Sequence, residues 1–192
     1  FSSGGPGTEV NARIRGGGSS QTLVLIDGAI VNSGTLGSYD FSNLTTDNIE
    51  RVEILRGAQS MLWGSDAMGG VINIVTKKGE GPLSASGFLE YGSFASLREG
   101  GTVSGKKGLV DYSLSLSRWD TSSFSAVNYR RGATERDSFR NWQGSGRIGV
   151  ELPRDGRLDF SMRWMNSDTQ LDNVSATFPA DVYGSKMRTQ QY

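Results

Sequence analysis

The chain has 192 residues, and its 20 Lys and Arg side chains are balanced by 20 Asp and Glu, which gives a formal net charge of zero. A nucleic-acid partner is disfavoured, because phosphate binding requires a surplus of basic residues on one face. Histidine and cysteine are both absent, which excludes histidine-based triads, cysteine nucleophiles, disulfides and zinc sites built on these ligands. Glycine is frequent (27 residues) and proline rare (4), a composition that favours a β-protein with many tight turns.

The first 79 residues hold short, irregular elements. The apolar run 23–26 (LVLI) ends at the turn dipeptide Asp27-Gly28 and is predicted to be a buried strand. After a loop rich in small residues, Thr45 or Thr46 is predicted to cap a helical turn. The other predicted elements are strands at 51–55 and 71–77 and a short helical turn at 60–63.

After residue 79 the pattern changes to long stretches in which every second residue is apolar, which predicts strands with two unlike faces. Residues 110–118 (VDYSLSLSR) and 157–164 (RLDFSMRW) show this alternation clearly, and residues 141–150 show it more weakly. Further strands are predicted at 83–91 and 97–103.

The predicted connections alternate in length. Residues 105–108 and 153–156 read as tight turns, whereas 119–139 and 166–186 read as connections of roughly 20 residues, long for a compact soluble domain. Short turns on one side and long loops on the other, joining strands of about 10 residues, are typical of an outer-membrane barrel. The alternative is a soluble sandwich, whose apolar faces meet in a core and whose strands usually have about five or six residues.

Three tryptophans favour the barrel. Trp119, Trp142 and Trp164 all fall near the long-loop ends of predicted strands, and counting from the 153–156 turn places Trp142 and Trp164 roughly opposite each other on the apolar side. Aromatic residues at one height are typical of a lipid–water boundary. The alternative is that they form cross-strand aromatic pairs, which also occur in soluble sheets.

Residues 14–33 (IRGGGSSQTLVLIDGAIVNS) and 49–78 (IERVEILRGAQSMLWGSDAMGGVINIVTKK) resemble the plug domain of TonB-dependent outer-membrane receptors. The matching elements, in order, are Ile14-Arg15-Gly16, Leu25-Ile26-Asp27-Gly28, Ile49-Glu50-Arg51-Val52-Glu53, Arg56-Gly57, Gly64-Ser65-Asp66-Ala67 and Gly69-Gly70-Val71-Ile72-Asn73-Ile74. One departure is Ala58, where the family commonly has proline. Within the family, the chain is most similar to the cobalamin receptor group.

The resemblance implies a mainly β fold: a globular α+β plug domain over residues 1–79, then antiparallel transmembrane strands over 80–192 that begin a barrel of about 22 strands. It implies a place in the outer membrane of a Gram-negative bacterium, in contact with lipid. The implied function is import of a scarce, large nutrient: a cobalamin-like corrinoid, or alternatively an iron siderophore or haem. The energy-coupling protein TonB is expected to bind an N-terminal box that would precede Phe1.

The rival class is a soluble, secreted β-rich interaction module. An enzyme is not expected, since no catalytic constellation stands out. Asp27 and Asp66, the acid/base pair one would consider, both lie in turn contexts that favour aspartate for backbone reasons.

Two candidate binding sites follow from the resemblance. Ligand contacts are expected in the plug loop 32–38, at Asn32, Ser33, Thr35, Leu36 and Ser38. Calcium, which takes six to eight oxygen ligands, would have acids of the two long loops as its candidate ligands: Glu135, Asp137, Asp168 and Asp172. The arginines at 130, 131 and 136 oppose this calcium site by their charge.

A third candidate is an ionic contact between plug and barrel wall. Along strand 51–55, alternation places Val52 and Ile54 on one side, predicted to be the plug core, and Arg51 and Glu53 on the other, predicted to point toward the wall. Arg56 is expected to join this charged cluster. Exposed ion pairs would hold the plug with about 0–1 kcal/mol each. The alternative is an ordinary solvated strand face.

Overall fold

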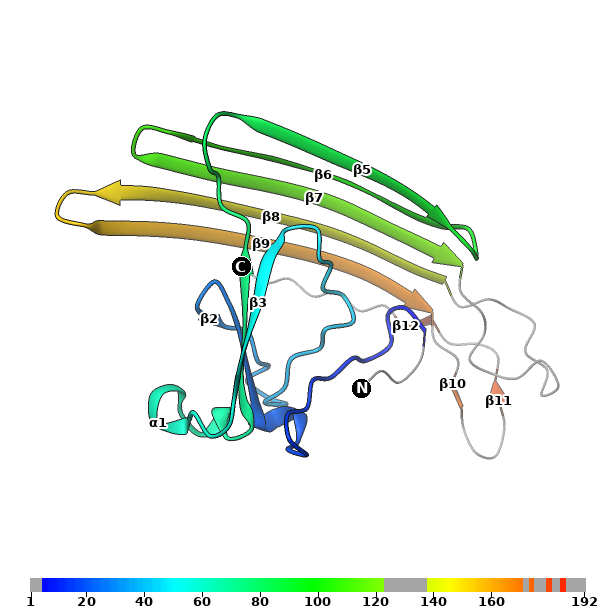
Figure 1. Ribbon diagram of the computed structural model, residues 1–192. Helices are drawn as coiled ribbons and strands as arrows, with labels where there is room; N and C mark the ends of the chain where they lie inside the picture. The colour runs from blue at the N-terminus through cyan, green and yellow to red at the C-terminus, as the bar shows by residue number, and fades with distance from the viewer. Residues whose placement is uncertain (1–4, 123–137, 171–172, 175–178, 181–183, 186–192) are drawn as a thin grey trace. The chain divides into compact units, whose positions relative to one another are not determined.

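The computed structural model describes residues 5–122, 138–170, 173–174, 179–180 and 184–185 (Figure 1). The chain divides into two compact units. The first comprises Phe1–Ser3 and Glu9–Lys77, and the second comprises Gly4–Thr8 and Lys78–Tyr192. Within the described ranges, every helix is too short or too polar to cross a membrane.

The first unit is built on a four-stranded sheet with the order β2-β1-β4-β3. The strands are β1 (Thr22–Ile26), β2 (Ala29–Ile30), β3 (Ile49–Arg56) and β4 (Gly70–Thr76), and the short helices are η1 (Ser19–Gln21), α1 (Ser60–Trp63) and η2 (Ser65–Ala67). β1 and β4 run parallel, whereas β2 and β3 pair antiparallel with their neighbours. The predicted strands and the helical turn at 60–63 are confirmed, with small differences in their bounds.

The core of this unit lies on both faces of β1 and β4. One cluster consists of Val24, Ile26, Tyr39, Ile72 and Ile74. A second cluster consists of Leu23, Leu25, Ala67 and Val71. A strand that is covered on both faces favours a continuous apolar run over alternation, which explains the sequence LVLI of β1.

The prediction that Val52 and Ile54 belong to this core is wrong for the structure. The two residues are 50% and 53% exposed, although their cross-strand partners Ile74 and Ile72 are buried. β3 is the last strand of the sheet, so the layer that covers β1 and β4 does not extend over it. Sequence alternation identified the two faces of β3 but not its edge position.

The predicted helical turn after Thr45 or Thr46 is wrong as well. The backbone there forms a single turn, in which the Ile49 N–H donates to the Thr46 carbonyl at 3.1 Å. A one-turn helix has few internal hydrogen bonds, and here the chain enters β3 directly.

Asp27 and Gly70 fix the ends of the central strands. Asp27 Oδ1 accepts from the Thr76 N–H (2.9 Å) and Oδ2 accepts from the Thr76 hydroxyl (2.6 Å), which ties the β1 turn to the end of β4. At Gly70 φ is +151°, and a Cβ there would lie 2.4 Å from the Leu55 carbonyl oxygen. Only glycine permits β3 to approach β4 this closely.

The second unit contains a six-stranded antiparallel sheet with the order β12-β9-β8-β7-β6-β5 (Figure 1). The strands are β5 (Ser84–Gly92), β6 (Ser96–Lys107), β7 (Val110–Ser122), β8 (Ser138–Leu152), β9 (Gly156–Gln170) and β12 (Gly184–Ser185), and β10 (Asn173–Val174) pairs separately with β11 (Pro179–Ala180). The predicted strands are confirmed, but β8 and β9 reach 15 residues each. They extend beyond the apolar alternation because charged and polar residues continue the ladder at their ends.

The two faces of this sheet differ in composition and in burial. The apolar face carries Val110, Tyr112, Leu114, Leu116, Ile148, Val150, Leu158, Phe160 and Met162, and the polar face carries Asp111, Ser113, Ser117, Asn141, Gln143, Arg147 and Ser167. Phe160 is 68% exposed and Leu114 60%, whereas Ser113 is 1% exposed and Asn141 2%. Soluble sandwiches bury their apolar faces; a membrane barrel turns them outward to lipid and its polar faces inward.

The tryptophans do not form one band. Trp142 and Trp164 lie on the apolar face, in neighbouring rows of the register. Trp119 lies on the polar face, where it packs edge-on against Phe139 (5.1 Å between ring centres) and donates from Nε1 to the Ser96 hydroxyl (3.2 Å). The predicted three-tryptophan band is therefore wrong for Trp119, because the apolar positions of β7 have even numbers.

Candidate functional site

An ion network lines the polar face near the tight turns. Its members are Lys106 on β6, Asp111 on β7, Arg147 and Glu151 on β8, and Arg157 and Asp159 on β9. Arg157 is the centre: its Nη2 lies 2.8 Å from Asp111 Oδ2, and its Nε lies 2.8 Å from Asp159 Oδ2. Asp111 is 3% exposed, so this carboxylate depends on Arg157 for the interactions that water would otherwise provide.

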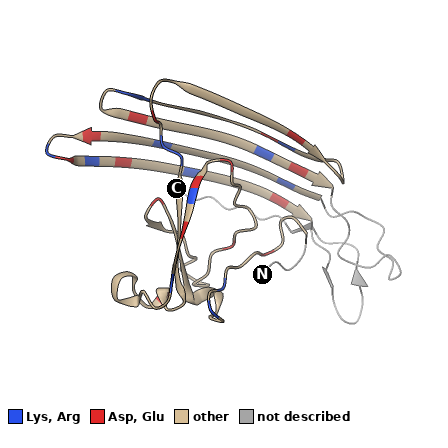
Figure 2. Ribbon diagram, in the orientation of Figure 1, with Lys and Arg blue, Asp and Glu red and all other residues tan. Residues whose placement is uncertain are grey.

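Two further ion pairs extend the network to its neighbours. Lys106 Nζ contacts Glu151 Oε1 at 2.6 Å, and Arg147 Nη2 contacts Asp159 Oδ1 at 3.0 Å. The network thus contains three cations and three anions, whose charges balance. Charged residues gather toward the ends of the strands (Figure 2). Because each of these side chains is paired with a residue on another strand, the charges on the polar face of the sheet neutralise one another without an additional ion.

Gly149 makes the centre of this network possible. It lies on the polar face between Asp111 and Asp159, which are its cross-strand partners on either side. A Cβ at this position would lie 2.1 Å from Arg157 Nη2 and within 2.8 Å of both Asp111 carboxylate oxygens. Arg157 therefore crosses over Gly149 to reach Asp111.

The predicted ligand loop, residues 32–38, is closed by its own hydrogen bonds. The Asn32 side chain accepts from the Val24 N–H (2.7 Å) and donates to the Thr22 (3.0 Å) and Gly37 (2.8 Å) carbonyls. Through these three hydrogen bonds, Asn32 attaches the loop to β1.

The tip of this loop remains open to solvent. The Ser33 hydroxyl accepts from the Thr35 and Leu36 N–H groups at 3.3 and 3.2 Å, and the Ser33 N–H donates to the Ser38 carbonyl at 2.9 Å. Leu36 is 71% exposed, and Thr35 beside it is also exposed. Of the predicted ligand contacts, Thr35 and Leu36 thus have side chains available, while Asn32 holds the loop in shape.

Arg51 and Glu53 lie together on β3, and Arg56 does not join them. Arg51 contacts Glu50 Oε1 at 2.6 Å and Glu53 Oε1 at 2.8 Å. A hydrogen bond from the Asn73 amide (2.9 Å), assisted by Arg51, lowers the pKa of the Glu53 carboxyl, and the same pairing with Glu53 raises the pKa of Arg51. Arg56 follows three positions after Glu53, so alternation along β3 directs it to the opposite face.

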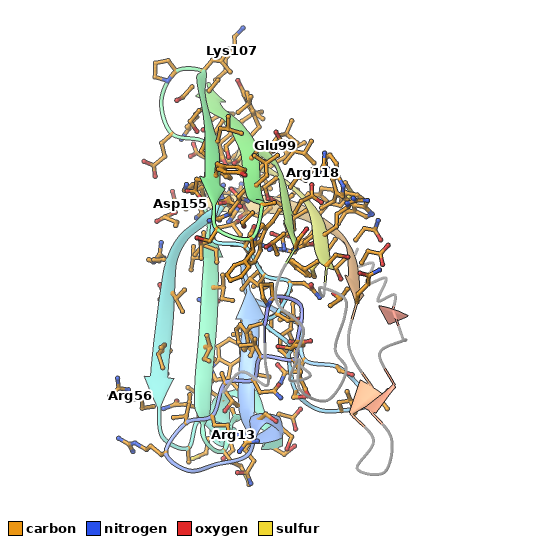
Figure 3. The ribbon with its side chains drawn as sticks, turned by 90° about the vertical axis from the view of Figure 1, so that its right-hand side faces the viewer. Arg13, Arg56, Glu99, Lys107, Arg118 and Asp155 are labelled. Atoms are coloured by element: carbon orange, nitrogen blue, oxygen red, sulfur yellow. The ribbon has the colours of Figure 1, made fainter. Side chains whose placement is uncertain are left out.

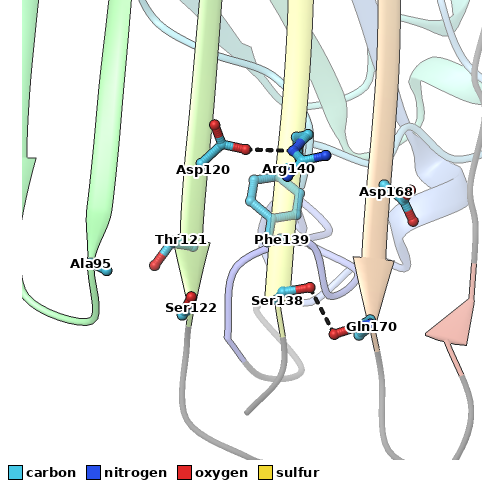
Figure 4. Close-up of a pocket in the computed structure, with 9 residues that line it drawn as sticks. All are labelled: Ala95, Asp120, Thr121, Ser122, Ser138, Phe139, Arg140, Asp168 and Gln170. Atoms are coloured by element: carbon cyan, nitrogen blue, oxygen red, sulfur yellow. Dashed lines mark hydrogen bonds and ion pairs between the residues drawn. The ribbon is translucent and has the colours of Figure 1, made fainter.

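Three of the four predicted calcium ligands lie outside the described residues, namely Glu135, Asp137 and Asp172. Asp168 is described and lies near the end of β9, as the cross-strand partner of Arg140. It lines a pocket with Asp120, Ser138 and Gln170 (Figure 4). No three acidic side chains in the described ranges gather closely enough to hold a metal ion.

Sequence reasoning missed the wall network. The available signal was that Asp111, Arg157 and Asp159 occupy odd-numbered, polar positions beside the two predicted tight turns. Which charges meet depends on the register between β7, β8 and β9, and alternation alone does not specify that register.

Residues 1–71 match the family described as TonB-dependent Receptor Plug Domain. A vitamin B12 transporter BtuB of Photobacterium profundum is 33% identical over 174 residues, which are 89% of this chain and 28% of that protein. A vitamin B12 transporter BtuB of Vibrio cholerae is 37% identical over 109 residues, 57% of this chain and 15% of that protein. The chain thus spans about a quarter of the length of the first relative and less of the second.

Solved structures show the same fold. The siderophore receptor PirA of Acinetobacter baumannii is 29% identical with a TM-score of 0.61, over 82% of this chain and 25% of that one. The pyoverdine outer membrane receptor FpvA of Pseudomonas aeruginosa has a TM-score of 0.67 at 22% identity, over 86% of this chain and 24% of that one, and this likeness concerns the fold alone. With the plug-type sheet and the outward apolar face, these similarities place the chain in the TonB-dependent receptor family of the Gram-negative outer membrane.

Proposed function

We propose that the chain is the plug domain and the first barrel strands of a TonB-dependent transporter that imports a large, scarce nutrient across the outer membrane. The observation that carries this proposal is the inverted burial of the second unit. A sheet with 60% exposed Leu114 on one face and 1% exposed Ser113 on the other suits a wall between lipid and a wet lumen. The family consists of transporters and receptors, not of enzymes.

The proposed cargo is a cobalamin-like corrinoid. The relatives named vitamin B12 transporter, at 33% and 37% identity, support this choice. An iron siderophore is the second candidate, supported by the 29% identical siderophore receptor PirA. In either case the exposed loop tip at Thr35 and Leu36 is the proposed plug contact for the cargo.

The ligand is tested by equilibrium binding to the intact receptor, with cyanocobalamin and a panel of ferric siderophores. We expect cyanocobalamin to bind and Leu36→Ser to weaken binding about tenfold, the effect of losing one well-packed apolar contact. Leu109→Ser is the matched control, because Leu109 is similarly exposed (60%) but lies in the tight turn between β6 and β7. Binding of a siderophore without cyanocobalamin would replace the corrinoid proposal, and equal effects of both variants would reject the loop contact.

Energy coupling and the ionic plug contact belong to the same proposal. TonB is the proposed partner that drives plug rearrangement, and the Arg51–Glu53 pair is proposed to face the barrel wall. Replacing Arg51 and Glu53 together with alanine in the intact receptor should raise entry of bulky antibiotics or lower TonB-dependent uptake. Unchanged uptake and unchanged antibiotic exclusion would leave the pair as a solvated strand face.

Calcium is proposed as an accessory ion of the long loops, with Glu135, Asp137, Asp168 and Asp172 as its ligands. Binding of cyanocobalamin is measured with added calcium and after chelation. A loss of affinity on chelation that Asp168→Asn reproduces would support the site, and an affinity insensitive to chelation would exclude it.

A further inference from the structure

The apolar face of the second unit ends at a charged row. On β8 its outward positions run from Leu152 to Trp142, and the ten residue steps between them span about 34 Å along the strand. With a strand tilt of about 40°, this length corresponds to about 26 Å of height, close to the roughly 25 Å apolar band of outer-membrane barrels. The next outward position after Trp142 is Arg140, at the end of the sheet that leads into the long connection.

Five side chains at this boundary form a connected series on the apolar face. The Arg118 guanidinium lies 5.0 Å from the centre of the Trp142 ring, a cation–π distance. Arg118 also pairs with Asp120 and lies 3.8 Å from Glu99. Asp120 in turn accepts from Arg140 Nε at 2.8 Å, a bond drawn in Figure 4.

Arg140 is the open end of this series. Its side chain is 61% exposed, and the Nε bond to Asp120 is its single hydrogen bond or ion pair in the described part of the chain. Among the described residues, the four N–H groups on its two terminal nitrogens therefore have no acceptor. The bond to Asp120 restrains the guanidinium, which reduces the side-chain freedom that is lost when these groups bind an acceptor.

We propose that Arg140 binds the phosphate of a lipid head group in the outer leaflet, with Asp120 and Arg118 as positioning residues. Arginine presents paired N–H donors that match phosphate geometry. The residue lies one row beyond Trp142, where head groups meet water in a barrel whose long loops are extracellular. This interaction concerns the membrane surface of the receptor and is independent of its cargo.

The surrounding charges predict the direction in which two substitutions should change lipid binding. Arg118, Asp120 and Arg140 together carry one positive charge, and Glu99 partly offsets it through Arg118. Asp168 is the cross-strand partner of Arg140 on the same face, and its negative charge opposes an anionic head group. Removing the Asp168 charge should therefore strengthen lipid binding, whereas removing the Arg140 charge should weaken it.

The test uses the intact receptor in phosphatidylcholine vesicles with increasing fractions of phosphatidylglycerol, and lipid retention is counted by native mass spectrometry. Arg140→Gln should lower retention of phosphatidylglycerol about tenfold, as expected for losing a charge-assisted, bidentate contact, and Asp168→Asn should raise it. Arg140→Lys keeps the charge but not the fork of donors, so its retention of phosphatidylglycerol should lie between those of wild type and Arg140→Gln.

Lys107→Gln is the matched control, because Lys107 lies on the same strand as Glu99 but far from the Glu99–Arg118 pair (Figure 3). This variant should leave the retention of phosphatidylglycerol at the Arg140 boundary unchanged. Equal retention in wild type and Arg140→Gln, or an equal loss in Lys107→Gln, would overturn the proposal. Inorganic phosphate is added as a competitor: displacement of the lipid at millimolar phosphate would assign the site to the free anion instead and would also overturn the lipid assignment.

Discussion

Replacing Gly149 with alanine should dismantle the centre of the wall network. The new Cβ would lie 2.1 Å from Arg157 Nη2, so the guanidinium must move away. Asp111, which is 3% exposed, then loses the two bonds of 3.0 and 2.8 Å that it accepts from this nitrogen. Loss of one partner costs about 3–5 kcal/mol for a buried pair and about 0–1 kcal/mol for an exposed one. Because the Arg157 side chain is 29% exposed and that of Asp111 4%, we expect an intermediate loss of about 2 kcal/mol.

The assay is denaturant unfolding of the intact receptor in lipid vesicles, followed by tryptophan fluorescence. Gly144→Ala is the control on the same strand, since its Cβ would meet Trp164 at 3.6 Å and Leu116 at 3.8 Å, which are ordinary contacts. It should change stability by no more than about 0.5 kcal/mol.

A double-mutant cycle identifies the cause. If the cost comes from displacing the guanidinium, Gly149→Ala should cost much less in an Arg157→Ala background than in wild type, because the two changes act on one interaction. Equal losses for Gly149→Ala and Gly144→Ala, or strictly additive effects in the cycle, would refute this explanation of Gly149.

Three other predictions test separate parts of the structure. Leu114→Arg should destabilise the membrane-inserted receptor by about 2–4 kcal/mol, as measured by vesicle unfolding, whereas Ser115→Arg on the opposite face should cost clearly less; equal costs would contradict the assignment of the faces. Asn32→Ala should leave two backbone groups of β1 and one of the ligand loop without their partner, at about 1–3 kcal/mol, and should weaken cargo binding. Unaltered binding together with unaltered proteolysis of the loop would contradict the role of Asn32 in holding the loop to β1. Because the folded-state pKa of Glu53 is lowered, its stabilising contribution is present above the ordinary carboxyl pKa and lost on acidification. Glu53→Gln should therefore destabilise the receptor at pH 7 but not at pH 3, and a pH-independent difference between variant and wild type would argue against this charge effect.

Alternation and motif together made most of the fold predictable. The pattern in residues 110–118 and 157–164 identified both faces of β7 and β9, since side chains in a strand point alternately to opposite sides. The continuous run LVLI identified β1 as a strand covered on both faces. For the candidate site, the structure shows that the Asn32 side chain ties loop 32–38 to β1, and the role of this loop in ligand binding stays a prediction.

What escaped prediction depends on neighbours that are distant in sequence. Val52 and Ile54 are apolar and alternate correctly, but their exposure follows from the edge position of β3, which requires the strand order. Trp119 falls on the polar face because the strand continues past Arg118 without a bulge. The pairing of Arg157 with Asp111 across Gly149 requires the register of three strands.

The orientation of the two faces is tested most directly by nitroxide labels on single cysteines introduced into the intact receptor in vesicles. This part of the protein contains no cysteine of its own, so Leu114→Cys, Ile148→Cys and Phe160→Cys report on the apolar face, and Ser115→Cys reports on the polar face. We predict that labels at 114, 148 and 160 relax with membrane-dissolved oxygen and are shielded from a water-soluble nickel complex, while the label at 115 shows the reverse. Nickel access at 114, 148 and 160 with oxygen access at 115 would contradict the proposal that the apolar face meets lipid.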